Sequence, residues 1–195
     1  MDRYRIIFSG SGGQGVITAS LFLAEAAVLY EGLNAVQSQT YGPEARGGAT
    51  RADVIISERP IRFPRVNQPN ILVSLTQQAY NLFSGAIRPG ALLLTDSHFV
   101  QQEQKVDARQ VSLGMYKAVM EEIGKPVVFN ICMLGALLEL TAVIKRESLL
   151  KVLETRVPQE FQEANNKAFD LGQKLARKYQ GTGQRSQNRD RRPVP

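Results

Sequence analysis

The chain is poor in residues that hold redox metals. Its 195 residues include one cysteine, one histidine and no tryptophan. The single cysteine, Cys132, excludes an internal disulfide and any cysteine-held iron–sulfur cluster or zinc ion within this chain. The only histidine, His98, has no Cys-His grouping around it. We therefore expect no metal site here, and we expect Cys132, which lies in an apolar stretch, to pack as a small core residue.

Long apolar runs are missing as well. No run of 18 or more apolar residues occurs, and Met1-Asp2-Arg3-Tyr4 leads directly into a predicted strand without a charged and then apolar leader. These features predict neither a membrane-spanning helix nor a secretory signal. We therefore expect a cytoplasmic protein with no membrane partner.

Positive charge is concentrated at the C-terminal end. The formal net charge is +6, and the segment from Lys174 onward accounts for all of it, with Asp190 as its one acidic residue. This segment lacks the interleaved aromatic residues that a nucleic-acid partner would favour. We expect one domain over residues 1–180, followed by a basic, solvated and disordered tail over residues 181–195, and no nucleic-acid partner.

Glycine, in contrast, is clustered near the start of the chain. The apolar run Ile6–Phe8 is followed by Gly10-Ser11-Gly12-Gly13-Gln14-Gly15-Val16, which opens a long apolar run ending at Tyr30. A strand, a glycine loop and a helix in this order form an anion cradle, because the loop amides and the positive end of the helix point at one place. Phosphate is the natural ligand of such a cradle. The alternative is that the glycines serve only a tight turn and close packing of the helix on the sheet.

Segments typical of strands and helices alternate along the chain. Strands are expected at 6–8, 34–40, 49–57, 71–75 and 91–96, and helices at 16–30, 77–83, 116–123, 131–144, 147–154 and 159–179. The first strand, the first helix and residues 34–40 have the size of a β-α-β unit. The alternation predicts an α/β fold, a Rossmann-like three-layer sandwich with a mainly parallel sheet, closed by C-terminal helices.

Several local expectations are more specific. Gly32 is placed to end the first helix, and Asn130 to cap the helix that follows it. Residues 126–129 are expected to form an extended link, and Gly181-Thr182-Gly183 to end the last helix. Residues 99–109 are polar and match no element.

Two standard nucleotide sites do not fit the sequence. A dinucleotide site needs an acidic residue near the end of the second strand, but Ser38, Gln39 and Thr40 stand there, and Glu44 is the first acid. A P-loop needs a Lys-Ser or Lys-Thr pair after its glycines, which is absent. The segment Tyr41-Gly42-Pro43-Glu44-Ala45-Arg46-Gly47-Gly48 has the composition of a binding loop, although Glu44 and Arg46 could also form only an exposed ion pair.

Four motifs taken together resemble the gamma subunit of the 2-oxoacid:ferredoxin oxidoreductases. They are Gly10-x-Gly12-Gly13-Gln14-Gly15-Val16, Gln39-x-Tyr41-Gly42-x-Glu44-x-Arg46-Gly47-Gly48, Asn130 with Leu134-Gly135-Ala136, and Asn165-x-x-Ala168-Phe169-x-x-Gly172. The resemblance runs from about Tyr4 to Gly172, so residues 1–180 correspond to the gamma-type catalytic domain. The second motif is most similar to the 2-oxoglutarate branch. The pyruvate, branched-chain 2-oxoacid and indolepyruvate branches remain alternatives.

The resemblance implies a subunit of a complex that converts a 2-oxoacid and coenzyme A into an acyl-CoA, carbon dioxide and reduced ferredoxin. Such complexes use thiamine diphosphate, Mg and iron–sulfur clusters. The resemblance further implies that these cofactors are held by alpha and beta subunits, and in some complexes by a ferredoxin-like delta subunit. Ferredoxin is then the electron acceptor. We expect no catalytic residue on this chain.

The implied contribution of this chain is assembly and part of a coenzyme A site. The expected ligand-contacting residues are Gly10, Gly12, Gly13, Gln14 and Gly15 of the first loop, and Gln39, Tyr41, Gly42, Glu44, Arg46, Gly47 and Gly48 of the second. The first loop would contact an anionic part of coenzyme A or pack on a partner subunit, and the second would form an intersubunit wall. The alternatives are a free-standing nucleotide-binding Rossmann-like protein and a purely structural subunit of the same complex.

Overall fold

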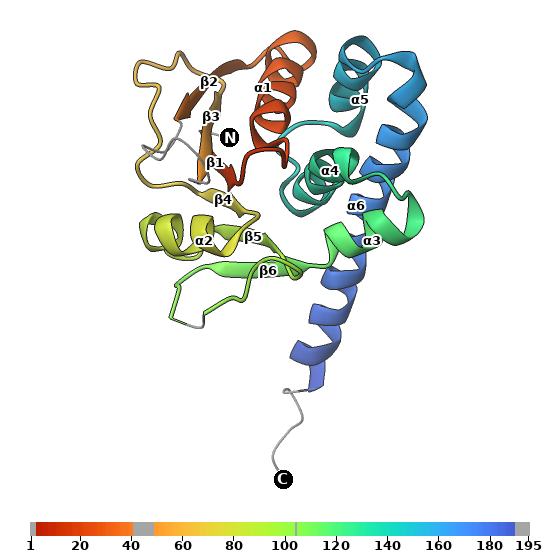
Figure 1. Ribbon diagram of the computed structural model, residues 1–195. Coiled ribbons are helices and arrows are strands. Elements are labelled where there is room, and N and C mark those ends of the chain that lie inside the picture. The colour runs from red at the N-terminus through yellow and green to blue at the C-terminus, as the bar shows by residue number, and fades with distance from the viewer. Residues whose placement is uncertain (1–2, 41–48, 104, 190–195) are drawn as a thin grey trace.

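The computed structural model describes residues 3–40, 49–103 and 105–189, with side chains described as far as residue 182. Figure 1 shows a twisted sheet flanked by helices. The strands are β1 (Tyr4–Gly10), β2 (Asn34–Thr40), β3 (Thr50–Ser57), β4 (Ile71–Ser74), β5 (Leu92–Asp96) and β6 (Arg109–Leu113). The helices are α1 (Val16–Glu31), α2 (Gln77–Phe83), α3 (Met115–Glu122), α4 (Phe129–Thr141), α5 (Arg146–Arg156) and α6 (Gln159–Arg189).

The strands form one sheet in the order β2-β3-β1-β4-β5-β6. Strands β1, β4, β5 and β6 pair in parallel, whereas β3 is antiparallel to both of its neighbours, β1 and β2. The expected α/β class with a mainly parallel sheet is therefore confirmed. The expected β-α-β unit differs in one respect, because β3 is inserted between β1 and β2.

This insertion changes what lies beside the glycine loop. In the pairing of β1 with β3, Gly10 is opposite Thr50 and Ser9 is opposite Arg51. The neighbour of the glycine loop is therefore the beginning of β3, and β2 is one strand further away. The geometry that places an acidic residue of a second strand on a ribose is consequently not reproduced here.

Alternate residues of the strands enter two hydrophobic clusters on opposite faces of the sheet. Ile6 and Phe8 of β1 belong to the larger cluster, which also contains side chains of α1, α4, α5 and α6. Ile7 belongs to the smaller cluster, which includes Tyr80 of α2. Helices thus cover both faces, and the C-terminal helices close the larger one, as expected (Figure 1).

Two glycines allow α4 and α6 to pack backbone against backbone. A Cβ atom on Gly135 of α4 would overlap the carbonyl oxygen of Phe169, and one on Gly172 of α6 would overlap the carbonyl oxygen of Cys132. Any side chain at either position would force the helices apart. Two of the sequence motifs therefore describe a single helix crossing.

Several local expectations were wrong. Strand β6 begins at Arg109, in a polar segment that had suggested no element, and residues Pro126–Val128 form a 3-10 helix instead of an extended link. Asn130 lies inside the first turn of α4 instead of capping it. Helix α6 continues past Gly181 and Gly183 to Arg189, because each glycine costs a helix only about 1 kcal/mol. The domain boundary at residue 180 stays a prediction, and residues 190–195 lie outside the described residues.

Cys132 is a core residue, as predicted. Its side chain is fully buried in α4, and this burial raises the pKa of the Cys132 thiol to about 12. Since only the thiolate reacts with alkylating reagents, iodoacetamide at pH 8 is expected to leave folded protein unlabelled and to label unfolded protein readily. Mass spectrometry after timed labelling, with and without denaturant, measures both. Rapid labelling without denaturant would contradict the buried position.

Candidate functional site

The glycine loop between β1 and α1 has a backbone that requires glycine at two positions. Gly13 has φ +86° and Gly15 has φ +70°, in the left-handed region that other residues rarely adopt. Gly15 is also the N-cap residue of α1, directly before Val16. The loop therefore turns the chain sharply from the carboxyl end of β1 into the positive end of the helix.

Gln14 fixes the loop to the sheet. Its Oε1 accepts a hydrogen bond from the backbone N–H of Ser11 at 2.8 Å, and its Nε2 donates to the carbonyl oxygen of Leu75 at 3.1 Å. A Cβ atom on Gly10 would lie 2.5 Å from Gln14 Oε1. The side-chain amide of Gln14 is thus used inside the chain, and Gly10 makes room for it.

Asn130 fixes the loop to α4. Its Nδ2 donates to the carbonyl oxygen of Gly15 at 3.4 Å, and a Cβ atom on Gly15 would lie 2.6 Å from that same Nδ2. The amide of Asn130 is nearly buried. The first and third sequence motifs therefore meet at one contact, which the expected cap role of Asn130 had missed.

Gly12 differs from its neighbours in the loop. It has no left-handed φ, and a Cβ atom there would have no heavy atom within 4 Å among the described residues. Within the described part of the chain, the backbone N–H groups of Gly12 and Gly13 also have no hydrogen-bond acceptor. Folding of the described chain therefore gives no reason for glycine at position 12, whereas close approach of another molecule would.

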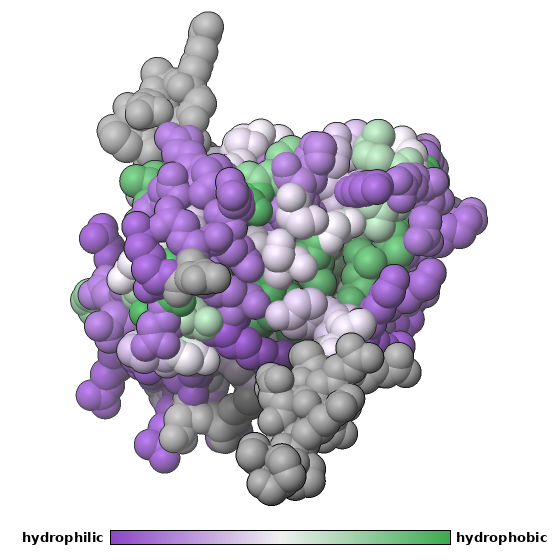
Figure 2. Space-filling view, turned by 90° about the horizontal axis from the view of Figure 1, so that it is seen from below, coloured by the Kyte–Doolittle hydropathy of each residue, from purple (hydrophilic) through white to green (hydrophobic). Residues whose placement is uncertain are grey.

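The loop forms one end of a groove of about 700 Å³. Most of the remaining wall is apolar: Ile17, Phe22, Val127, Val128, Ile131, Val157, Pro158 and Phe161. Phe161 is 40% exposed and Val127 70% exposed. Figure 2 shows apolar surface in a recess between hydrophilic side chains on the face that it draws. An anion at the loop could thus extend an apolar body along the groove.

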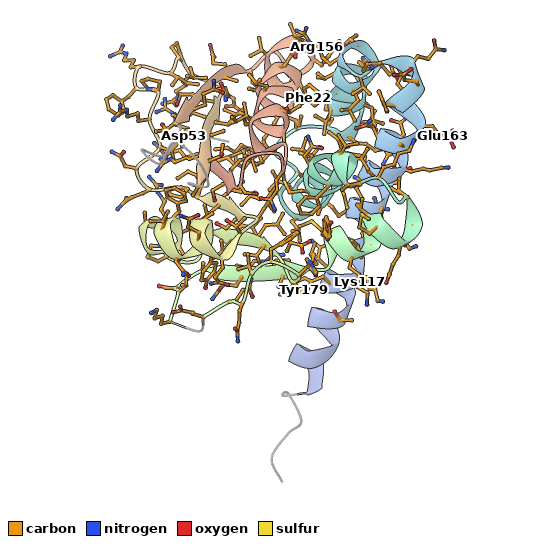
Figure 3. All side chains as sticks on the ribbon, in the orientation of Figure 1. Phe22, Asp53, Lys117, Arg156, Glu163 and Tyr179 are labelled. Atoms are coloured by element: carbon orange, nitrogen blue, oxygen red, sulfur yellow. The ribbon has the colours of Figure 1, made fainter. Side chains whose placement is uncertain are left out.

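Polar side chains from α5, α6 and β3 also line the groove, in addition to those of the loop, α1 and α4. Arg156 of α5 is held by Glu25 of α1, with Nε 2.9 Å from Oε1, and this pairing raises the pKa of Arg156. Figure 3 shows Phe22 on the same helix α1, on the side that faces α5. Asn165 is buried and donates to the carbonyl oxygen of Phe161 at 2.8 Å. Thr50 lines the groove from β3.

A second polar cluster lies at the end of β5. The Asp96 carboxylate is fully buried, and burial raises its pKa although the backbone N–H groups of His98 and Tyr116 donate to it at 2.9 and 2.8 Å. The His98 ring stacks on Tyr116 with 5.2 Å between centroids. Because Tyr116 is in the first turn of α3, Asp96 serves to fix that helix to the sheet.

The structure brings together only part of the expected site. Gly12, Gly13 and Gly15 line the groove, whereas Gly10 and Gln14 support the loop from behind. Gln39 is exposed on β2 and is not part of the groove wall. The remaining second-loop residues lie outside the described residues: Tyr41, Gly42, Glu44, Arg46, Gly47 and Gly48. The sequence motifs did not predict the apolar wall of the groove, and they did not indicate that Asn165 lines it.

None of the helices in the described residues combines the length and apolarity needed to cross a membrane. The described residues contain no group of three or more His, Cys, Asp or Glu side chains that could hold a metal ion.

Known proteins share this fold and sequence. The gamma subunit of keto/oxoacid ferredoxin oxidoreductase from Geobacter sulfurreducens is 40% identical, with a TM-score of 0.85 over 92% of this chain and 99% of that chain. The 2-oxoglutarate:ferredoxin oxidoreductase of Magnetococcus marinus, solved with 2-oxoglutarate, coenzyme A and succinyl-CoA bound, shares the fold at 24% identity and a TM-score of 0.80; the match covers 91% of this chain and 31% of that chain. The chain is therefore similar in fold and sequence to a gamma subunit of a multi-subunit oxidoreductase.

Sequence comparison gives the family. The pattern of pyruvate ferredoxin/flavodoxin oxidoreductases matches residues 5–175. The 2-oxoglutarate synthase subunit KorC of Methanocaldococcus jannaschii is 44% identical over 177 residues, covering 90% of this chain and 95% of that subunit, and the KorC of Archaeoglobus fulgidus is 36% identical over 174 residues. The chain belongs to this family, as a gamma subunit of a 2-oxoacid:ferredoxin oxidoreductase.

Proposed function

We propose that this subunit serves a complex that oxidises 2-oxoglutarate with coenzyme A, and that its glycine loop contacts an anionic part of coenzyme A. The 2-oxoglutarate synthase subunits at 36–44% identity, matched over about nine tenths of this chain, support the substrate. The products are then succinyl-CoA, carbon dioxide and reduced ferredoxin. Pyruvate synthase subunit PorC of Methanothermobacter marburgensis is 32% identical over 171 residues, so pyruvate is the competing substrate.

The redox chemistry is assigned to partner subunits. We propose that alpha and beta subunits, with a ferredoxin-like delta subunit in some complexes, hold thiamine diphosphate, Mg and the iron–sulfur clusters. A cluster needs several thiolates, and this chain has one thiol, which burial keeps protonated. This chain would contribute a binding surface whose shape is set by its own fold.

The observation that carries the loop's role is the pair of amides at Gly12 and Gly13. They have no acceptor among the described residues, they stand beside the positive end of α1, and the apolar groove begins there. Coenzyme A joins an anionic pyrophosphate to a long arm of low charge. This combination fits an anion cradle that continues into an apolar groove better than a dinucleotide with two riboses does.

A negative charge at position 12 tests this role. Gly12→Asp is expected to weaken coenzyme A binding by the assembled complex at least tenfold, because the carboxylate would repel the ligand's phosphates at the loop. The fold should be kept, since a Cβ there meets no described atom and φ is not left-handed. Calorimetric titration of the complex with coenzyme A measures the affinity.

Gly85→Asp is the matched control. Gly85 also lacks a left-handed φ and has no atom within 4 Å of a Cβ, but it follows α2 and is not part of the groove wall. The Gly85→Asp variant adds the same charge away from the groove, and it should leave the affinity of the complex for coenzyme A unchanged. If Gly12→Asp binds coenzyme A as the parent does in an intact complex, the loop has only a packing role.

A further inference from the structure

Four arginine side chains line one pocket. The pocket lies at the end of the sheet where β1 begins, and the glycine loop lies at the other end, where β1 finishes. Arg3 and Arg5 stand at the start of β1, Arg65 lies between β3 and β4, and Arg88 lies in the turn before β5. Strand β1 leads from this pocket to Gly10, so pocket and loop are at opposite ends of one strand. The pocket has a volume of about 460 Å³.

These arginines lack acidic partners in the described part of the chain. Every ion pair there is made by other basic side chains, so no described carboxylate neutralises the four guanidinium groups. The other polar side chains of the wall are the neutral amides of Asn67 and Gln68. Burial, Arg88 and Arg3, in that order, lower the pKa of Arg5. The cluster is therefore a place of concentrated positive potential.

Hydrogen bonds connect the backbone segments around the pocket. Asn70, directly before β4, connects this segment to the start of β1. Its Oδ1 accepts a hydrogen bond from the N–H of Arg5 at 2.7 Å, and its Nδ2 donates to the carbonyl oxygen of Arg3 at 3.1 Å. The N–H of Arg88 donates to the carbonyl oxygen of Pro69 at 3.1 Å. The arginines are thus brought together by the fold, and a ligand would not have to pay for ordering the segments that carry them.

We propose that this arginine pocket binds a small anion that carries two or more phosphoryl groups. Planar guanidinium groups bind phosphate oxygens in a bidentate manner, and several of them together match the several charges of a polyphosphate. Phe63 lines the same pocket and is 61% exposed, so it offers an aromatic face to a nucleoside base. A pocket of this volume suits a small molecule.

Titration calorimetry with inorganic tripolyphosphate and with ATP tests the proposal, on both the assembled complex and the isolated full-length chain. Saturable binding is expected in both, and the double variant Arg65→Gln with Arg88→Gln should weaken it at least tenfold. If ATP binds more tightly than tripolyphosphate, and if the Phe63→Ala variant loses this difference in affinity, the ligand of the pocket is a nucleotide. Equal binding of both probes would identify the phosphoryl groups alone.

Arg109→Gln is the control, because Arg109 is an exposed arginine at the start of β6, outside the pocket. It should leave the affinity within twofold of the parent. Thermal melts without ligand check that every variant folds. The proposal is overturned if neither probe binds, if Arg109→Gln weakens binding as much as the double variant, or if the complex has lost the binding that the isolated chain shows. The last result would mean that an acidic partner subunit covers the pocket.

Discussion

Replacing Gly172 by alanine is expected to lower the free energy of unfolding by about 3 kcal/mol or more. The new Cβ would overlap the carbonyl oxygen of Cys132 and lie 2.8 Å from the backbone nitrogen of Ala136. Because both are backbone atoms of α4, no rotamer change can relieve the overlap, and α6 must move away. That movement would open the core around the buried Phe169. Denaturant unfolding followed by circular dichroism measures the loss.

Gly181→Ala provides the control on the same helix. A Cβ on Gly181 has no atom within 4 Å among the described residues, and alanine favours a helix over glycine by about 1 kcal/mol. This variant should be as stable as the parent or slightly more stable. A Gly172→Ala protein that unfolds at the same denaturant concentration as Gly181→Ala would show that α4 and α6 do not pack backbone against backbone.

Asp53→Ala is expected to cost about 3 kcal/mol, because it removes one member of a largely buried ion pair. Arg51 Nε and Nη2 donate to the Asp53 carboxylate at 2.6 and 2.9 Å, and the N–H of Val66 donates to it at 3.0 Å. Arg51 also stacks on the ring of Phe83 at 5.3 Å. The carboxylate thus joins β3, the segment before β4 and α2 over the smaller hydrophobic cluster. Unfolding in urea measures the effect.

An exposed ion pair serves as the comparison. Lys167 and Glu163 pair along α6 with Nζ 2.6 Å from Oε1, and both side chains are mostly in solvent. Figure 3 shows Glu163 on the outer side of the molecule and Asp53 within the sheet region. Lys167→Ala should leave stability unchanged within error. Equal losses in the two variants would mean that burial does not set the value of the Asp53 pair.

Local patterns in the sequence predicted α1 and the glycine loop well. The apolar run after Gly15 and the placement of Gly32 give the helix, which ends at Gly32 in the left-handed conformation. The direction of β3 could not be read in this way, because its partners β1 and β2 are distant in sequence and local propensity is the same for parallel and antiparallel strands. Strand β6 was missed since its sequence, RQVSL, is short and half polar.

The motifs predicted the family correctly, but they predicted the roles of individual residues less well. Gly10, Gly15 and Gln14 resemble ligand-binding residues in sequence, but the structure uses Gln14 and the space at Gly10 and Gly15 to fix the loop. Gly135 and Gly172 proved to serve helix packing. Such roles depend on atoms from distant segments, which no spacing rule contains. Gly12 remains the loop glycine whose reason must be sought outside the described chain.

The most direct test of the account is to purify the complex through a tag on this chain and measure ferredoxin reduction. Larger subunits are expected to co-purify, and ferredoxin reduction is expected to require both a 2-oxoacid and coenzyme A. The complex should use 2-oxoglutarate faster than pyruvate, and the isolated chain should be inactive. A chain that purifies without larger subunits, or a complex that reduces ferredoxin without a 2-oxoacid and coenzyme A, would show that this chain does not serve such an oxidoreductase.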